Sequence, residues 1–257
     1  MKTKIIHVLS VLMALVVLLS IPSMASDKIE SVYTAVNQAV TTAQAETEEP
    51  TEPTEPTEPN DPTEPEESEL DFNAVPGDTV VGRMYICTQA VGLGHAWIYI
   101  ESDFNGDMPI GCYTLKPYQG VSMGTFALSR SDGPGLYYNI ESYCANEWGL
   151  KNQSWLGMDI TKDQLVKVSN RIKQWNYWDL YFNCTFFAVE IWNCVSSKKM
   201  IPILFPFIIK WQILMHGGNR DVVLKEVDRN DCYKQKGVAG NVHIELVSDG
   251  SLDSKLM

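Results

Sequence analysis

The spacing of apolar and polar residues divides the chain into a part that favours strands and a later part that favours helices. Five short runs are rich in β-branched and aromatic residues, and clusters of Gly, Asn, Asp and Pro separate them. The pair Asn105-Gly106 follows the second run, is typical of a tight turn, and predicts a hairpin between the second and third runs. The predicted strands are residues 80–88, 95–101, 110–115, 121–126 and 136–143.

The later part of the chain shows a helical period. Apolar side chains recur at helical spacing after residue 161, and Thr161 with Gln164 matches the two halves of a capping box. A second apolar stripe begins at Cys184 and predicts a helix that starts there. Residues 242–247 are predicted to form a last strand. A run of strands followed by helices favours the α+β class.

The first 25 residues have the pattern of a secretory signal peptide. Lys2 and Lys4 precede a nearly unbroken aliphatic run at residues 5–21, and small residues at Ser23 and Ala25 fit a cleavage site. Because the run approaches the length of a bilayer span, an uncleaved anchor is the alternative. We expect cleavage after Ala25 and a secreted protein whose membrane contact is limited to this segment.

Charge is concentrated in one segment of the chain. The 257 residues include 20 Lys and Arg against 32 Asp and Glu, for a formal net charge of −12. Twelve of the acidic residues and no basic one lie at residues 46–71, where repeated Thr-Glu-Pro predicts an extended, semi-rigid linker. A short segment, residues 26–45, precedes this linker, and a nearly neutral domain, residues 72–257, follows it. This distribution excludes a basic nucleic-acid surface.

The six cysteines all lie in the domain and form no C-x-x-C pair, so neither a metal site nor a cofactor is predicted. Cys184 and Cys194 cannot bridge each other if both lie on one helix, because ten residues of helix separate them by about 15 Å. The sequence does not decide whether Cys184 or Cys194 forms a disulfide with one of the other cysteines.

A second apolar stretch, residues 200–215, contains two prolines and Lys210. It is shorter than the roughly 17–25 residues that cross a bilayer. We therefore expect a buried, irregular helix here rather than a membrane contact.

Cys184 differs from the other cysteines in its predicted position. Asn183 directly precedes it and is a preferred N-cap residue, so the sulfur would lie in the first turn of a helix. There the unpaired N–H groups and the positive end of the helix dipole stabilise a thiolate and lower the pKa of the thiol. An ionised thiol is a candidate nucleophile, and it needs a base nearby.

His95 is the best candidate for that base. It opens a predicted strand directly after a Gly-Leu-Gly segment, and residues 96–100 are all apolar, which indicates a rigidly buried strand. His216 is expected at a helix C-terminus, and His243 is expected on the exposed face of the last strand. The predicted catalytic pair is therefore Cys184 with His95.

Two short motifs around this pair resemble a known superfamily. Residues 94–100, Gly-His-Ala-Trp-Ile-Tyr-Ile, resemble the G-H-V-x-I-Y-I strand of NlpC-type cell-wall peptidases. Residues 183–188, Asn-Cys-Thr-Phe-Phe-Ala, resemble the N-C-x-x-F-A/V helix start of their circularly permuted, papain-like relatives. Those relatives include the YiiX-like amidases and the lecithin retinol acyltransferase group. As in the permuted branch, His95 precedes Cys184 in the chain.

The resemblance implies a permuted papain-like fold, in which an antiparallel sheet packs on the helix that carries the cysteine. Cys184 would be the nucleophile and His95 the general base and then the acid, with backbone N–H groups stabilising the oxyanion. The family also places a polar residue beside the histidine. Tyr113 is one candidate for this role, and Asn139 and Glu141, in an otherwise aromatic run, are the others. The alternative for the last two is an exposed face of an edge strand.

These observations favour one function and leave two others open. The favoured function is that of a secreted, monomeric thiol hydrolase that cleaves amide bonds in a peptide or cell-wall peptide through an acyl-enzyme on Cys184. One alternative is a catalytically silent module that binds a cell-surface or carbohydrate ligand. The other is a lipid acyltransferase or thioesterase.

Overall fold

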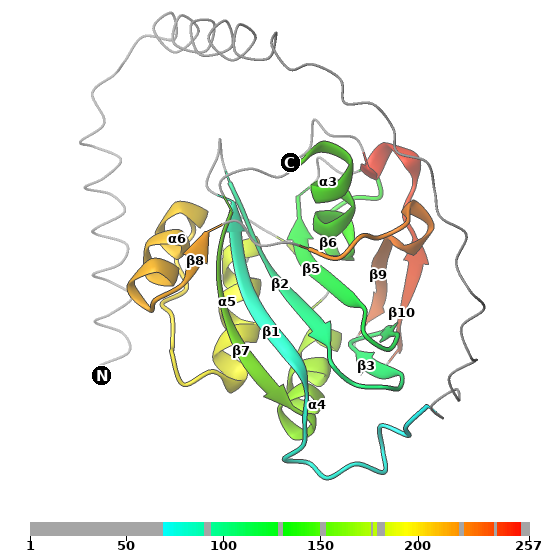
Figure 1. Cartoon of the computed structure of the whole chain (residues 1–257). Coiled ribbons are helices and arrows are strands. Elements are labelled where there is room, and N and C mark those ends of the chain that lie inside the picture. Colours follow the sequence, from blue (N-terminus) through cyan, green and yellow to red (C-terminus); the bar gives the residue numbers. More distant parts are fainter. Residues whose placement is uncertain are drawn as a thin grey trace, which may run out of the picture. The chain divides into compact units, whose positions relative to one another are not determined.

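A computed structural model describes residues 69–89, 94–127, 131–149, 153–175, 177–178, 183–220, 224–238 and 241–252. These residues form a mixed α+β unit around an eight-stranded sheet whose neighbouring strands are all antiparallel (Figure 1). The predicted α+β class is confirmed. The sequence-based predictions for the signal peptide, the short segment 26–45 and the acidic linker up to residue 68 lie outside the described residues.

The strand order in the sheet is β10-β9-β6-β5-β2-β1-β7-β8, and a separate hairpin consists of β3 and β4. In chain order the strands are β1 (Val80–Gln89), β2 (His95–Ser102), β3 (Met108–Ile110), β4 (Tyr113–Leu115), β5 (Gly120–Phe126), β6 (Gly135–Tyr138), β7 (Gln153–Thr161), β8 (Asn219–Arg220), β9 (Tyr233–Val238) and β10 (Asn241–Leu246).

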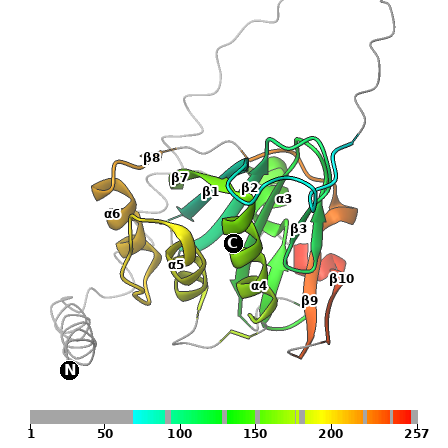
Figure 2. The ribbon, with the colours of Figure 1, turned by 90° about the horizontal axis from the view of Figure 1, so that it is seen from below.

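Helices cover both faces of this sheet. They are α3 (Ile140–Trp148), α4 (Lys162–Lys173), α5 (Cys184–Val195) and α6 (Pro206–Met215). Figures 1 and 2 show α4, α5 and α6 on one side of the sheet and α3 on the other. Among the described residues, no helix is both long and apolar enough to cross a membrane.

The central strands are buried on both faces, which explains the continuous apolar run at residues 96–100. Ile98 and Ile100 on β2 belong to the main core together with residues of α5. Trp97 and Tyr99 on the same strand point to the opposite face and pack with Leu224. Because side chains alternate between the faces of a strand, both faces must be covered for such a run to be stable.

Both predicted helix starts are confirmed. Thr161 caps α4 in a complete capping box with Gln164. Asn183 caps α5, so Cys184 is the first helical residue. These signals are local, because a cap side chain bonds backbone N–H groups only two or three residues away.

The predicted hairpin between the second and third strands is wrong. β2 pairs with β5, whereas β3 and β4 pair with each other, with Ile110 opposite Tyr113. The turn between β3 and β4 contains Gly111 at φ 60°, a left-handed conformation that glycine adopts without steric cost. Gly111 therefore makes the tight turn that the sequence pattern had assigned to Asn105-Gly106.

The predicted strand at residues 136–143 is correct only in its first half. β6 ends at Tyr138, and Asn139 takes a left-handed conformation with φ 66° before α3 begins. The side chain of Asn139 holds this turn, since its Oδ1 accepts from the Ser122 N–H at 3.3 Å and its Nδ2 donates to the Asp231 carbonyl at 2.9 Å. Glu141 consequently lies in the first turn of a helix and not in a strand.

Candidate active site

Cys184 lies at the start of α5, where the side chain of Asn183 fixes the backbone. Oδ1 of Asn183 accepts from the N–H groups of Thr185 at 3.0 Å and Phe186 at 3.4 Å. Its Nδ2 donates to the carbonyl of Leu204 at 2.9 Å, which ties the helix start to the segment before α6. The Cys184 N–H is not among the groups that this cap bonds, and the first N–H of a helix has no partner within the helix.

His95 is the first residue of β2, and its ring is held between aromatic side chains. Gly94 before it has φ 75° and approaches Pro206 so closely that a Cβ there would lie 2.9 Å from that ring. The imidazole stacks on Phe126 at 4.4 Å and on Trp97 at 5.8 Å between ring centroids. His95 is only 7% exposed, so these contacts and its hydrogen bonds leave it one orientation.

The sulfur of Cys184 is hydrogen-bonded where β2 and β5 stop pairing. Their ladder covers Ile98 to Glu101 on β2, and continuing its register would place Ala96 opposite Thr125. The Ala96 N–H instead donates to the sulfur of Cys184, and the Thr185 N–H, which bonds Oδ1 of Asn183, also lowers the pKa of the thiol. The opening of the ladder thus supplies a backbone donor to the thiol from the strand that carries the histidine.

Cys184 and His95 hydrogen-bond each other, and each shifts the pKa of the other. Burial raises the pKa of Cys184, but the charge and hydrogen bond of His95 and the two backbone donors outweigh it, so the pKa lies below that of an ordinary thiol. For His95, burial lowers the pKa, while the Cys184 charge and the bonds to Cys184 and Glu141 raise it to about 9. Each residue therefore favours the charged form of the other, a thiolate beside an imidazolium.

Glu141 completes a chain of three side chains. Its Oε1 lies 2.8 Å from Nε2 of His95, and the residue is fully buried. Since this bond occupies Nε2, the other ring nitrogen is left for Cys184. A Cβ on Gly124 of β5 would lie 1.9 Å from Oε1 and 2.7 Å from Nε2. Only glycine at this position leaves room for the His95–Glu141 pair.

The other two candidates for the polar residue beside His95 bond elsewhere. The hydroxyl of Tyr113 donates to Oδ2 of Asp231 at 2.7 Å. The side-chain bonds of Asn139 hold the turn before α3. The structure therefore brings Glu141, and not Tyr113 or Asn139, into contact with His95. Asn139 is also buried, so the alternative of an exposed edge-strand face is wrong for both Asn139 and Glu141.

The other two histidines of the described residues, His216 and His243, lie where the sequence predicts them. His216 is the C-cap of α6, and its N–H bonds the last carbonyls of that helix. His243 lies exposed on β10, with Nε2 3.1 Å from Glu245.

None of the six cysteines forms a disulfide. Four of the other five differ electrostatically from Cys184. Burial raises the pKa of four of the others: Cys87, Cys112, Cys194 and Cys232. Cys194 lies in the last turn of the helix that Cys184 starts, where the negative end of the dipole does not favour a thiolate.

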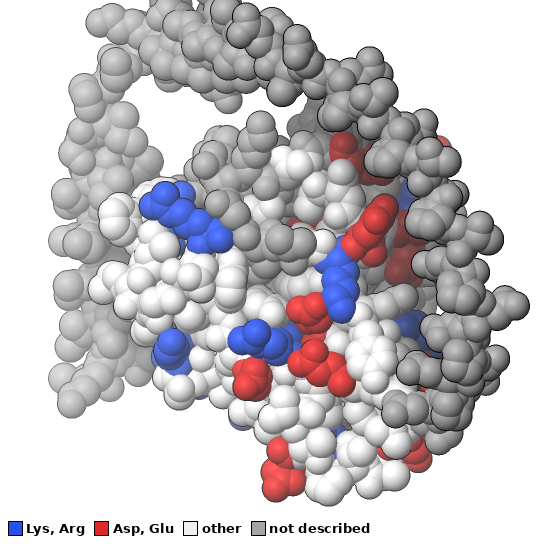
Figure 3. Space-filling view, viewed as in Figure 1, with Lys and Arg blue, Asp and Glu red and all other residues white. Residues whose placement is uncertain are grey.

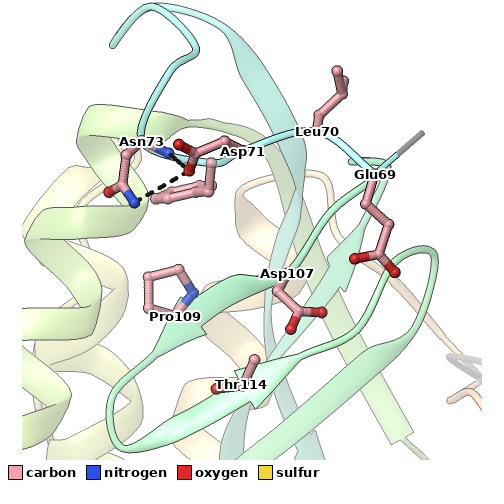
Figure 4. A pocket seen from close by; sticks show the side chains of 8 residues that line it. Glu69, Leu70, Asp71, Asn73, Asp107, Pro109 and Thr114 are labelled. Carbon is pink, nitrogen blue, oxygen red and sulfur yellow. Dashed lines mark hydrogen bonds between the residues drawn. The ribbon is translucent and has the colours of Figure 1, made fainter.

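A surface pocket of the domain lies away from this site. It is formed between the segment 69–73 and the β3–β4 hairpin, and it shares no residue with the Cys184 site (Figure 4). Two of its acidic residues are already bonded, since Asp107 accepts from Lys116 at 2.7 Å and Asp71 from the Asn73 N–H at 2.9 Å. Within the described ranges, no three His, Cys, Asp or Glu residues are grouped as they would be around a metal ion.

No protein-family model, curated protein or solved structure matches the chain. The chemistry of the site thus rests on its own geometry. α5, β2 and α3 supply a thiol, an imidazole and a carboxylate in a hydrogen-bonded row. A nucleophile, a base and a group that orients the base are the components of a covalent catalytic site.

Proposed function

We propose that the domain is a cysteine hydrolase of the circularly permuted papain-like group. The observation that carries this proposal is the hydrogen-bonded row Cys184–His95–Glu141, in which the pKa of the thiol is lowered and that of the imidazole is raised. The position of the histidine on a strand that precedes the cysteine helix in the chain supports the same assignment.

The proposed reaction proceeds through an acyl-enzyme. The Cys184 thiolate attacks the carbonyl carbon of an amide and forms a C–S bond, and the carbonyl oxygen becomes an oxyanion. The imidazolium of His95 gives its proton to the amide nitrogen as the C–N bond breaks, which releases an amine. Neutral His95 then takes a proton from water, whose oxygen attacks the thioester carbon. Release of the carboxylic acid restores the thiolate and the imidazolium.

Two features of the site serve this cycle. The N–H of Cys184, which the Asn183 cap leaves unbonded, is a donor for the oxyanion at the positive end of α5. Glu141 acts as a positioning residue, because its bond to Nε2 directs the other ring nitrogen to the sulfur and its charge favours the imidazolium. The presence of a third polar group weakens the alternative of a catalytically silent module.

The substrate class proposed is an amide in a peptide or cell-wall peptide, on the resemblance of residues 94–100 and 183–188 to the cell-wall peptidases and amidases. Secretion and the absence of a cofactor belong to the same proposal. A nearly neutral domain would recognise such a substrate by shape and local hydrogen bonds rather than by a long-range field.

The test is hydrolysis of a panel of cell-wall peptides by the full chain and by two matched variants. Cys184→Ala should lose activity by at least about 10³-fold, while Cys194→Ala, on the same helix, should retain it. Circular dichroism shows whether each variant is folded. Equal turnover by Cys184→Ala and the unchanged chain would contradict the proposal.

A further inference from the structure

The outer face of α6 carries a stripe of large apolar side chains that nothing in the described residues covers. Phe207, Trp211 and Met215 follow one another at intervals of four residues and are 46%, 65% and 83% exposed. Ile201, 52% exposed, lies beside the helix because the Gln212 side chain bonds both its N–H and its carbonyl. Residues four apart lie on one side of a helix, so this is a continuous surface.

This exposure does not result from a loosely held helix. The opposite side of α6 is buried through Pro206, Ile209 and Ile213, which pack into the main core. The expectation of a buried helix at residues 200–215 is thus correct only for residues 206–215, and there for one face only. The sequence keeps aromatic and apolar residues on the other face, where they add nothing to the core.

The surroundings of the stripe are basic. Residues 191–220 include Lys198, Lys199, Lys210 and Arg220 and no Asp or Glu. Nζ of Lys198 bonds the carbonyl of His216 at 3.0 Å, which places its charge at the end of α6 that carries Met215. In Figure 3 the surface over α6 and β8 shows blue Lys and Arg atoms on white and no red atoms. The rest of the domain mixes both signs.

We propose that this α6 face docks on an anionic lipid surface. Exposed Trp and Phe side chains insert at the headgroup boundary, and nearby Lys and Arg bind anionic headgroups. The charge selects lipid over a second copy of this chain, because two surfaces of four positive charges each would repel. This docking site lies in the domain. It is a second membrane contact, in addition to the signal peptide, which was the only one expected from the sequence.

The α6 face is connected to the candidate active site through the segment before the helix. The carbonyls of residues 203, 204 and 206 accept hydrogen bonds from the side chains of Thr185, Asn183 and Thr88. Docking would therefore fix the start of α5 near the lipid surface, where a substrate anchored to the membrane is concentrated. This placement does not depend on the chemistry of Cys184.

Quenching of tryptophan fluorescence by brominated lipid tests the docking. The full chain is mixed with vesicles of brominated phosphatidylcholine, either pure or with brominated phosphatidylglycerol. All seven tryptophans lie after residue 96, so insertion of the N-terminal apolar segment brings no tryptophan of its own into the bilayer. Quenching is expected only with the anionic lipid, and Trp211→Phe should remove most of it, because Trp211 is the most exposed of the tryptophans whose side chains the structure describes.

Charge variants complete the test. Lys198→Glu with Lys199→Glu should weaken binding to anionic vesicles at least about tenfold. Val166→Ser, which removes an exposed apolar side chain from α4, should bind as the unchanged chain does. Three results would each overturn the proposal. The first is equal quenching by both kinds of vesicle, and the second is no quenching. The third is a dimer that forms without lipid and that Trp211→Ser dissociates. Cys184→Ala separates this proposal from the hydrolase, because it should lose turnover and keep the quenching.

Discussion

The N-termini of α4 and α5 are built with the same capping chemistry but face different surroundings. At α4 the first two N–H groups, of Lys162 and Asp163, bond the carbonyls of Thr79 and Gly77 at 2.9 Å each. Thr161 and Gln164 then close the capping box. At α5 the cap bonds the second and third N–H groups, and within the described part of the chain no carbonyl accepts from the Cys184 N–H.

The difference shows what makes a helix start reactive. Both helices have a positive dipole end, but at α4 the chain's own carbonyls use its donors. At α5 the first N–H, that of Cys184, is left for an open position beside the sulfur, with His95 opposite. A cap residue before a cysteine is therefore not enough. The group that faces the helix start decides whether it stabilises the fold or activates a nucleophile.

Replacing the group opposite α5 should have the largest effect. His95→Gln removes the charge that stabilises the thiolate, while burial still raises the pKa of Cys184. At about pH 6, labelling of Cys184 by iodoacetamide should fall at least about tenfold, and peptide hydrolysis about 10²- to 10⁴-fold. Peptide-resolved mass spectrometry measures the labelling. Unchanged labelling would mean that the helix start alone activates the thiol. That result would contradict the comparison with α4.

Gly124→Ala should disrupt the same pair sterically. The new methyl group would lie 1.9 Å from Oε1 of Glu141, so the carboxylate must move away from His95. We expect a loss of about 1–3 kcal/mol in the free energy of unfolding and slower labelling of Cys184. Gly157→Ala on β7 is the matched control, because the atoms nearest to its methyl group belong to Tyr85 and Trp155. It should destabilise the domain without slowing the labelling.

Glu141→Gln should change the pH dependence more than the rate at neutral pH. The charge of Glu141 and its hydrogen bond help to raise the pKa of His95 to about 9, so loss of the charge lowers that pKa. The proposed reaction requires the imidazolium as acid, and its alkaline limit should therefore move from about 9 to lower pH. Glu141→Asp should restore the limit in part. A purely structural role of Glu141 would reduce activity without moving the limit.

Removing the caps should have the smallest effect and compares the two helices directly. Thr161→Ala and Asn183→Ala should each lower the free energy of unfolding by about 1 kcal/mol, as measured by urea titration. Asn183→Ala alone should also slow labelling of Cys184. Equal labelling of both variants would show that the cap of α5 has only a structural role.

The sequence predicts the local features of this fold and misses the non-local ones. The caps at Thr161 and Asn183 involve neighbouring residues, and both were predictable. The strand pairing was not predictable from the sequence, because the turn at Gly111 has no stronger local signal than the competing turn at Asn105-Gly106. β7 and β9 were missed, since glycines and polar residues interrupt their apolar pattern.

The candidate site shows the same division. Residue types and position were enough to select Cys184 and His95. They were not enough to choose among Tyr113, Asn139 and Glu141, because the choice depends on where β6 ends. The left-handed turn at Asn139 rotates Glu141 onto α3 and toward His95. The only local signal was the asparagine itself, a residue that tolerates this conformation.

The central claim is that His95 lowers the pKa of Cys184 below that of an ordinary thiol. The most direct measurement is the rate of iodoacetamide modification of each cysteine as a function of pH, resolved by mass spectrometry. The claim predicts that the rate at Cys184 levels off below the ordinary thiol pKa of about 8.5, while the rate at Cys194, on the same helix, levels off only above it. If the rate at Cys184 instead rose about tenfold per pH unit up to that pKa, the claim would be wrong.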